Sequence, residues 1–104
     1  MSDALFQNLS TVQNNTQPTP VTMAAAATIA PSTFLTKVTG TTNVATITPP
    51  VTGSCVLLLK STDASPGDLL TTGNINAGIT TVAQNDIVFC VYDPVTAKWD
   101  ARIL

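Results

Sequence analysis

The chain has 104 residues, a formal net charge of −2 and a pI of about 4.4, with no histidine and no glutamate. This length fits a single domain. The four Lys and Arg residues are scattered, which argues against binding to nucleic acid or to an anionic membrane surface.

The composition favours β-structure. The sequence holds 19 Thr, 10 Val and 6 Ile, so about a third of its residues are β-branched. Such side chains fit a pleated, half-buried surface better than a helix. No stretch approaches ~18 consecutive apolar residues, so no membrane-spanning helix is expected. The chain also lacks the pattern of a secretory signal peptide, which predicts synthesis and assembly in a cytosol.

Residues 1–33 are predicted to be an extended N-terminal arm. They contain one charged residue, Asp3, and the aperiodic run "TVQNNTQPTP". The opening "SDALFQNL" allows either one helical turn or a row of apolar anchors, and "MAAAATIA" is ambiguous between helix and strand. An arm of this kind is either disordered or becomes ordered on a partner, and we favour the partner. The predicted contact residues are Leu5, Phe6, Leu9, Val12, Val21, Met23 and Ile29.

Residues 34–104 are predicted to form a β-rich body. Short alternating or apolar runs are separated by Gly, Pro and Asn, as in a small antiparallel sandwich or barrel. The turn 40–43 is expected to join two strands as a hairpin, and two prolines end the second of them. The expected strands are 33–39, 44–48, 54–60, 79–83, 86–92 and 98–104. The apolar runs 54–60 and 86–92 are expected to be central strands, and residues 93–97 a hairpin loop. Phe34, Thr36 and Val38 are expected on one face of the first strand.

The size of this body predicts self-association. A domain of 71 residues buries only around 60–65% of its unfolded surface, so its stability alone is marginal. Its strands carry Thr, Ser and Asn where a monomer usually places Lys and Glu. We therefore expect a homo-oligomer. The residues expected in the core or at the subunit interface are Phe34, Leu57, Leu59, Phe89, Trp99 and Ile103.

The ionisable residues do not form a recognisable catalytic pattern. Asp63 and Asp68 flank a Pro-Gly loop, and Asp93 and Asp100 flank the last hairpin, where aspartates commonly accept backbone N–H bonds. A carboxylate-pair active site and a calcium loop in "DASPGD" are both disfavoured. We expect no enzyme activity, no cofactor and no metal.

Three further residue types are interpreted as structural. Cys55 and Cys90 have neither CxxC spacing nor histidine partners, so buried thiols are favoured over a disulfide or a zinc site. Tyr92 and Trp99 can in principle stack against a sugar. Trp99, however, lies on the apolar face of its strand, which favours a core or interface position.

Three segments carry a family resemblance. "LTKVTGTTNVATITPP", then "TTGNI", then "VYDPVTAKW" occur in that order over residues 35–99. They resemble small β-rich virion proteins of tailed bacteriophages, in particular head-decoration (cement) proteins and the ends of tail fibres or spikes. The loop "KSTDASPGDLL" departs from the commoner pattern.

The resemblance implies a capsid decoration protein. Such a protein is typically a homo-oligomer, often a trimer, bound to the major capsid protein on the exterior of the virion after synthesis in the cytoplasm of the host bacterium. Its extended arm would lie across the joints between coat subunits. The alternative is a tail-fibre or spike module that recognises a glycan or protein on the host surface.

Overall fold

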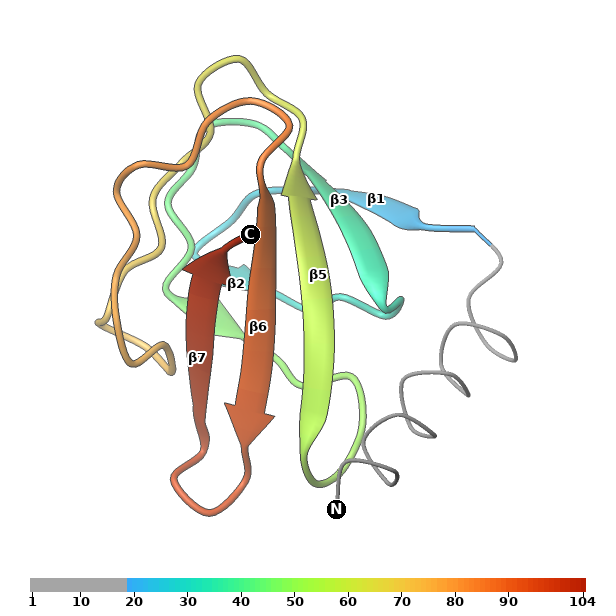
Figure 1. Cartoon of the computed structure of the whole chain (residues 1–104), viewed down its shortest axis with the longest axis vertical. Coiled ribbons are helices and arrows are strands. Elements are labelled where there is room, and N and C mark those ends of the chain that lie inside the picture. Colours follow the sequence, from blue (N-terminus) through green and yellow to red (C-terminus); the bar gives the residue numbers. More distant parts are fainter. Residues whose placement is uncertain (1–18) are drawn as a thin grey trace.

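The computed structural model describes residues 19–104, which form seven strands and contain no helix (Figure 1). The predicted all-β class is confirmed. The strands are β1 (Val21–Ala24), β2 (Thr28–Ile29), β3 (Leu35–Thr39), β4 (Thr46–Ile47), β5 (Cys55–Ser61), β6 (Ile87–Asp93) and β7 (Lys98–Ile103).

The strands form two sheets that enclose one core. The larger sheet has the order β1-β3-β5-β6-β7, and β2 pairs with β4 in a small second sheet. Loops from residues 62–86 extend this second layer through isolated bridges at Leu69 and Ile79, while Ile75 bridges to Trp99 at the β7 edge of the large sheet. In Figure 1 the large sheet lies in front of the layer that holds β2. Alternate residues of the large sheet face the second layer, so apolar side chains from both layers meet between them.

The prediction of a purely antiparallel body is wrong for the first half of the chain. β1 pairs with β3 in parallel, and β3 pairs with β5 in parallel, whereas β5-β6 and β6-β7 are antiparallel. After β1 and β3 the chain crosses to the second layer, where β2 and β4 also pair in parallel. After β5 it reaches Leu69, which bridges to Val44 in parallel. The returns that give β3 and β5 therefore start from the same end of the sheet as β1, which makes β1, β3 and β5 parallel, whereas the return after residues 62–86 gives β6 in the opposite direction.

The predicted hairpin between 33–39 and 44–48 does not form. The chain leaves the large sheet at Gly40, whose φ is +86°, and residues 44–47 belong to the second layer. Val44 and Ile47 are both buried although they are three residues apart, so this segment does not alternate like a regular strand. The predicted strand 79–83 is also reduced, because only Ile79 makes a bridge.

The other strand predictions agree closely with the structure. β3, β5, β6 and β7 lie at or within two residues of the predicted limits, and residues 94–97 form the predicted hairpin turn. Phe34, Thr36 and Val38 were expected on one face, and all three are buried. Period-two alternation predicted β3 and β7 because only one face of each packs on the core, and the apolar runs predicted β5 and β6.

The folded body begins before residue 34. β1 is an edge strand of the large sheet, and the Val21 N–H donates to the hydroxyl of Thr33 at 3.2 Å. Ile29 in β2 is 2% exposed and belongs to the core. Residues 21–33, which the sequence assigned to the arm, are thus part of the two-layer body. The apolar residues of 21–29 show no single period of two, because β1 and β2 are short strands that lie in different sheets.

Candidate interaction surface

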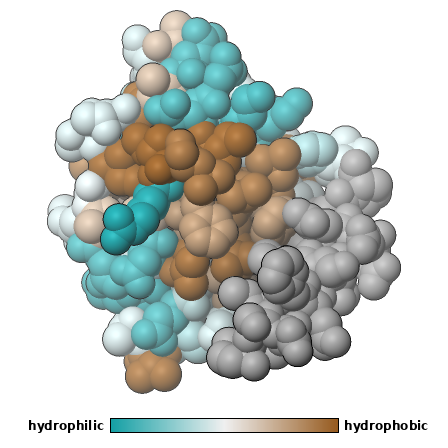
Figure 2. All heavy atoms as spheres, in the orientation of Figure 1, coloured by the Kyte–Doolittle hydropathy of each residue, from teal (hydrophilic) through white to brown (hydrophobic). Residues whose placement is uncertain are grey.

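The outer face of the large sheet is apolar at its centre. Strand register places Leu35, Leu58 and Phe89 side by side on β3, β5 and β6. Val56 and Val91 form the next row, and Ile87 lies beside Lys60 in the row on the other side. We call these six residues, Leu35, Val56, Leu58, Ile87, Phe89 and Val91, the outer patch. Figure 2 shows apolar atoms gathered on this face of the molecule.

Charged side chains border the outer patch. Lys37 and Lys60 are register partners at one end of the face. On β7, Arg102 is the register partner of Phe89, and Asp100 is the register partner of Val91. Sheets with one solvated face usually alternate between apolar and polar residues. β5 and β6 depart from this rule because both of their faces are apolar.

The outer patch was largely missed by the sequence reasoning. Residues 54–60 and 86–92 are apolar on both faces of the strand, which predicted that they are central strands. The corresponding strands β5 and β6 do lie inside the large sheet. The structure adds that, among residues 19–104, the second layer covers only one face of these strands. The missed signal was the absence of polar residues at alternate positions of two neighbouring strands.

The two edges of the large sheet differ. β7 is bonded on its far side, because the Trp99 N–H donates to the Asn74 carbonyl at 2.8 Å and the Asn76 N–H donates to the Trp99 carbonyl at 2.9 Å. β1 has no strand on its far side within the described part of the chain. Val21 in this edge strand is 40% exposed. A strand edge of this kind is a surface on which further pairing is possible.

The three segments that carry the family resemblance meet at one structural junction. The Ile47 N–H donates to Asn74 Oδ1, and Asn74 Nδ2 donates to the Ile47 carbonyl, both at 2.8 Å. The Trp99 Nε1–H donates to the same carbonyl at 2.8 Å. Ile47, Asn74 and Trp99, which we call the Asn74 junction, thus come from "VATIT", "TTGNI" and "AKW". These motifs build the fold.

Gly73 allows the Asn74 junction to close. A Cβ at residue 73 would lie 2.1 Å from the Ala45 carbonyl oxygen and 2.2 Å from Thr46 Oγ1. The Asn74 N–H also donates to the Ala45 carbonyl at 3.2 Å, so this turn lies directly on the second layer. The close approach of the two backbones explains the glycine in "TTGNI".

The predicted contact residues of the arm have different locations. Leu5, Phe6, Leu9 and Val12 lie outside the described residues. Val21 and Met23 are in β1, where Val21 is exposed and Met23 packs against the core. Ile29 is buried, so it is not available to a partner and its predicted contact role is corrected to a core role.

The residues predicted for the core or an interface divide in a similar way. Phe34, Leu57, Leu59 and Trp99 are buried, and Ile103 packs against the core cluster. Phe89 lies on the outer face, in the centre of the outer patch. The prediction did not distinguish core residues from interface residues. Burial and strand register assign Phe89 to the outer face and the other five residues to the core.

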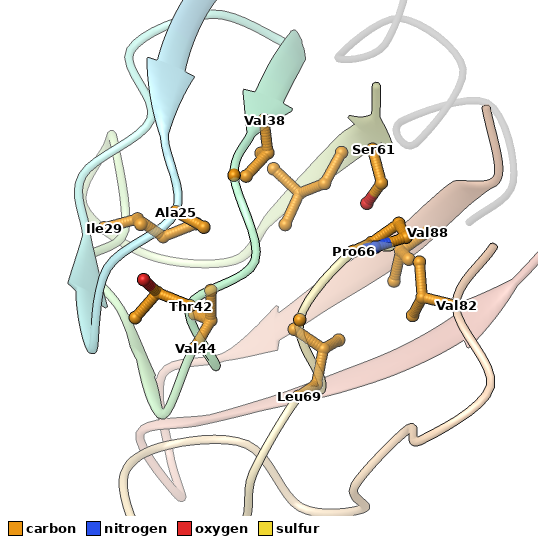
Figure 3. A pocket seen from close by; sticks show the side chains of 13 residues that line it. Ala25, Ile29, Val38, Thr42, Val44, Ser61, Pro66, Leu69, Val82 and Val88 are labelled. Carbon is orange, nitrogen blue, oxygen red and sulfur yellow. The ribbon is translucent and has the colours of Figure 1, made fainter. Parts of the chain in front are cut away.

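The space between the two layers is too small for an organic ligand. Figure 3 shows the gap that Ile29, Val38, Val44, Leu69 and Val88 surround, with a volume of about 20 Å³. One water molecule nearly fills such a volume, whereas ligand pockets measure ~300–1,000 Å³. This gap is a packing defect of the core.

A shallow open depression lies at the opposite end of the strands. It measures about 450 Å³ and is lined by residues 49–53 together with Tyr92 and Pro94. The Tyr92 ring lies 5.0 Å from the Trp99 ring at a tilt of 50°. Trp99 is fully buried, as the sequence favoured, so Tyr92 is the aromatic residue that borders the depression.

Three of the four aspartates in the two pairs, Asp63, Asp93 and Asp100, accept hydrogen bonds through their carboxylates. The Ser65 N–H donates to Asp63 Oδ1 at 2.9 Å, and the Val95 N–H donates to Asp93 Oδ1 at 2.9 Å. Asp100 accepts a bond from Asn76 Nδ2 at 2.9 Å. These are the turn and surface roles expected of short acidic side chains. Within residues 19–104, no three His, Cys, Asp or Glu side chains gather as a metal site would require.

Both cysteines are buried free thiols, as predicted. Burial raises the pKa of Cys90 to about 12 and also raises the pKa of Cys55. A thiolate is the reactive form of cysteine, so burial keeps both side chains chemically inert at neutral pH.

No family model, curated protein or solved structure matches this chain. Within residues 19–104 there is also no helix long and apolar enough to cross a membrane. The outer patch and the resemblance carried by the three motifs are therefore the features of this chain that bear on its function.

Proposed function

We propose that this chain is a structural protein of a bacteriophage particle, a capsid decoration protein that binds the outer shell as a homo-oligomer and stabilises it. The observation that carries the proposal is the outer patch, a sheet face of apolar residues with a charged border. A face of this composition gains free energy when another protein surface covers it. The assignment to a phage capsid depends on the resemblance.

The distribution of the chemically active side chains supports a binding role. The aspartates in the turns bond nearby N–H groups, and the thiols are buried. The partners we propose are the major capsid protein and further copies of the chain. The resemblance implies a trimer. The arm, through Leu5, Phe6, Leu9 and Val12, is the proposed contact with the coat.

The test uses particles of the phage that encodes the chain, prepared with and without its gene. We expect the protein on the capsid exterior by cryo-electron microscopy, and earlier genome release on heating for particles that lack it. Adding purified protein back to deficient particles should restore heat resistance. Deficient particles that resist heat as well as complete ones would overturn the stabilising role.

The second candidate is a tail-fibre or spike module for host recognition. The observation in its favour is the open depression beside Tyr92, because an exposed aromatic ring can stack on a sugar. In that case the particle images would place the protein on the tail. Labelled protein would also bind host cells, and Tyr92→Ala would abolish that binding.

A further inference from the structure

The arrangement of residues on the outer face is self-complementary about a two-fold axis. The axis in question lies parallel to the sheet, crosses the strands, and passes between the Leu58 row and the Val56 row. It reverses the order of the rows and keeps each strand over its own copy. Leu58 then faces Val56 of the second copy, and Phe89 faces Val91, in both directions.

The charged border obeys the same symmetry. Arg102 lies in the row of Phe89, and Asp100 lies in the row of Val91, on the same strand β7. The two-fold axis therefore places Arg102 opposite Asp100 of the second copy, and Asp100 opposite Arg102. It also brings the end that holds Lys60 toward the end that holds Asp93. Opposite charges meet without any change in the fold.

One cation at that end does not disturb the pattern. Lys98 is the register partner of Asp93, but its Nζ donates to the Gly73 carbonyl at 3.0 Å. Gly73 belongs to the second layer, so the ammonium group is drawn around the edge of the sheet and away from the outer face. Asp93 is left as the charge that Lys60 of the second copy approaches.

The face is large enough for a specific contact. Four strands about 4.8 Å apart, with six residues of about 3.3 Å each, make a face of roughly 400 Å² in projection. Two such faces with interdigitating side chains bury roughly 1,000 Å² in total, near the lower limit of specific interfaces. Stacked sheets whose strands align within about 30° are a common packing in proteins.

We propose that two copies of this chain associate through the outer patch, face to face, about this two-fold axis. This contact is the surface through which the homo-oligomer of the proposed function would form. The inference rests on the proposed function only in assuming that the chain self-associates. The two-fold contact predicts that the oligomer formed by the isolated protein is a dimer, whereas the resemblance implies a trimer.

The first experiment measures the mass of the full chain by sedimentation equilibrium from about 1 to 100 µM, the range expected for an interface of this size. We expect a monomer–dimer equilibrium. Val91→Glu places a carboxylate in each half of the interface and should weaken dimerisation at least about tenfold. Val95→Glu is the matched control, because Val95 is 91% exposed in the hairpin turn, and it should leave dimerisation unchanged.

The second experiment tests the symmetry through charge exchange. Asp100→Arg alone and Arg102→Asp alone each place like charges opposite one another, so each should weaken the dimer. The double exchange restores opposite charges at both contacts and should recover dimerisation to within about threefold of the original. Near-ultraviolet circular dichroism of the buried Trp99 reports whether each variant keeps its fold.

Four results would overturn the proposal: a monomer at the highest concentration, a strict trimer, a folded Val91→Glu variant that dimerises normally, or a double exchange that fails to recover. All of these measurements use isolated protein. They are therefore separate from the particle experiment, which alone decides the proposed function. A monomeric protein that still protects capsids would refute the two-fold contact and leave the decoration role in place.

Discussion

Cys90 shows how burial controls the chemistry of a single residue. Its side chain is fully buried on β6 between the two layers, and its Sγ lies 3.8 Å from the Val88 carbonyl oxygen. Burial disfavours the charged thiolate, which is why its pKa rises from 9.0 to about 12. The thiol thus acts as a small apolar group in the core.

The raised pKa of Cys90 predicts a loss of stability in alkali. Between pH 9 and 12 the unfolded chain releases the thiol proton while the folded protein retains it. The contribution of Cys90 to stability is therefore complete well below pH 9 and declines by about 1.4 kcal/mol per pH unit between pH 9 and 12. Urea unfolding at several pH values measures this slope.

The control for this prediction is Cys90→Ala, which lacks the titrating group. Its stability will be lower at neutral pH because it leaves a cavity, so only the slopes between pH 9 and 12 are compared. A slope equal to that of the unaltered protein would refute the role of the Cys90 thiol.

The Asn74 junction joins three elements that are far apart in the sequence. The side-chain amide of Asn74 pairs with both backbone groups of Ile47 in β4, as a neighbouring strand would. The backbone of Asn74 bonds β7 at Trp99. One residue of a loop therefore connects the small sheet to the last strand of the large sheet.

Removing this side chain should be costly. Asn74→Ala leaves the Ile47 N–H without its partner in a part-buried position, and we expect a loss of about 2 kcal/mol in the free energy of unfolding. Asn76→Ala is the matched control, because Asn76 bonds Asp100 at an exposed position. Its loss should stay below about 0.5 kcal/mol. Equal losses in the two variants would contradict the junction.

At the scale of the whole molecule, the body depends on residues 21–33. β1 and β2 start the parallel series in the two layers, and Ile29 fills the core beside its register partner Ile47 of β4. From the sequence alone, deletion of residues 1–33 would be expected to leave the body folded. The structure leads to the opposite expectation, because the deletion exposes the edge of β3 and removes a buried isoleucine.

We predict that the chain without residues 1–33 loses its cooperative thermal transition, as followed by Trp99 fluorescence. The point substitution Ile29→Ala should lower the free energy of unfolding by about 2–5 kcal/mol, since Ile29 is 2% exposed. Val21→Ala, at a position that is 40% exposed, should cost less than about 1 kcal/mol. A truncated chain that unfolds cooperatively at the original temperature would refute the dependence.

Much of the large sheet could be predicted because its signals are local. The alternation of Trp99, Ala101 and Ile103 predicted β7, and the apolar runs predicted β5 and β6 as central strands. The burial of Trp99 and both thiols followed from the same patterns. β3 and β7 pack one row of residues on the core and leave the other row outside, so the period of two is visible in their sequences, whereas β5 and β6 are recognised by their continuous apolar runs.

The sequence by itself determined the strand-forming character of the chain, its principal strands and the residues that cannot face water. Tertiary structure alone decided that β1, β3 and β5 run parallel, that residues 21–33 belong to the core, and that one apolar face of β5 and β6 lies outside it. The physical reason is that a period of two shows that a strand has two faces. Which face the core covers depends on contacts between residues far apart in the chain, such as Ile47, Asn74 and Trp99.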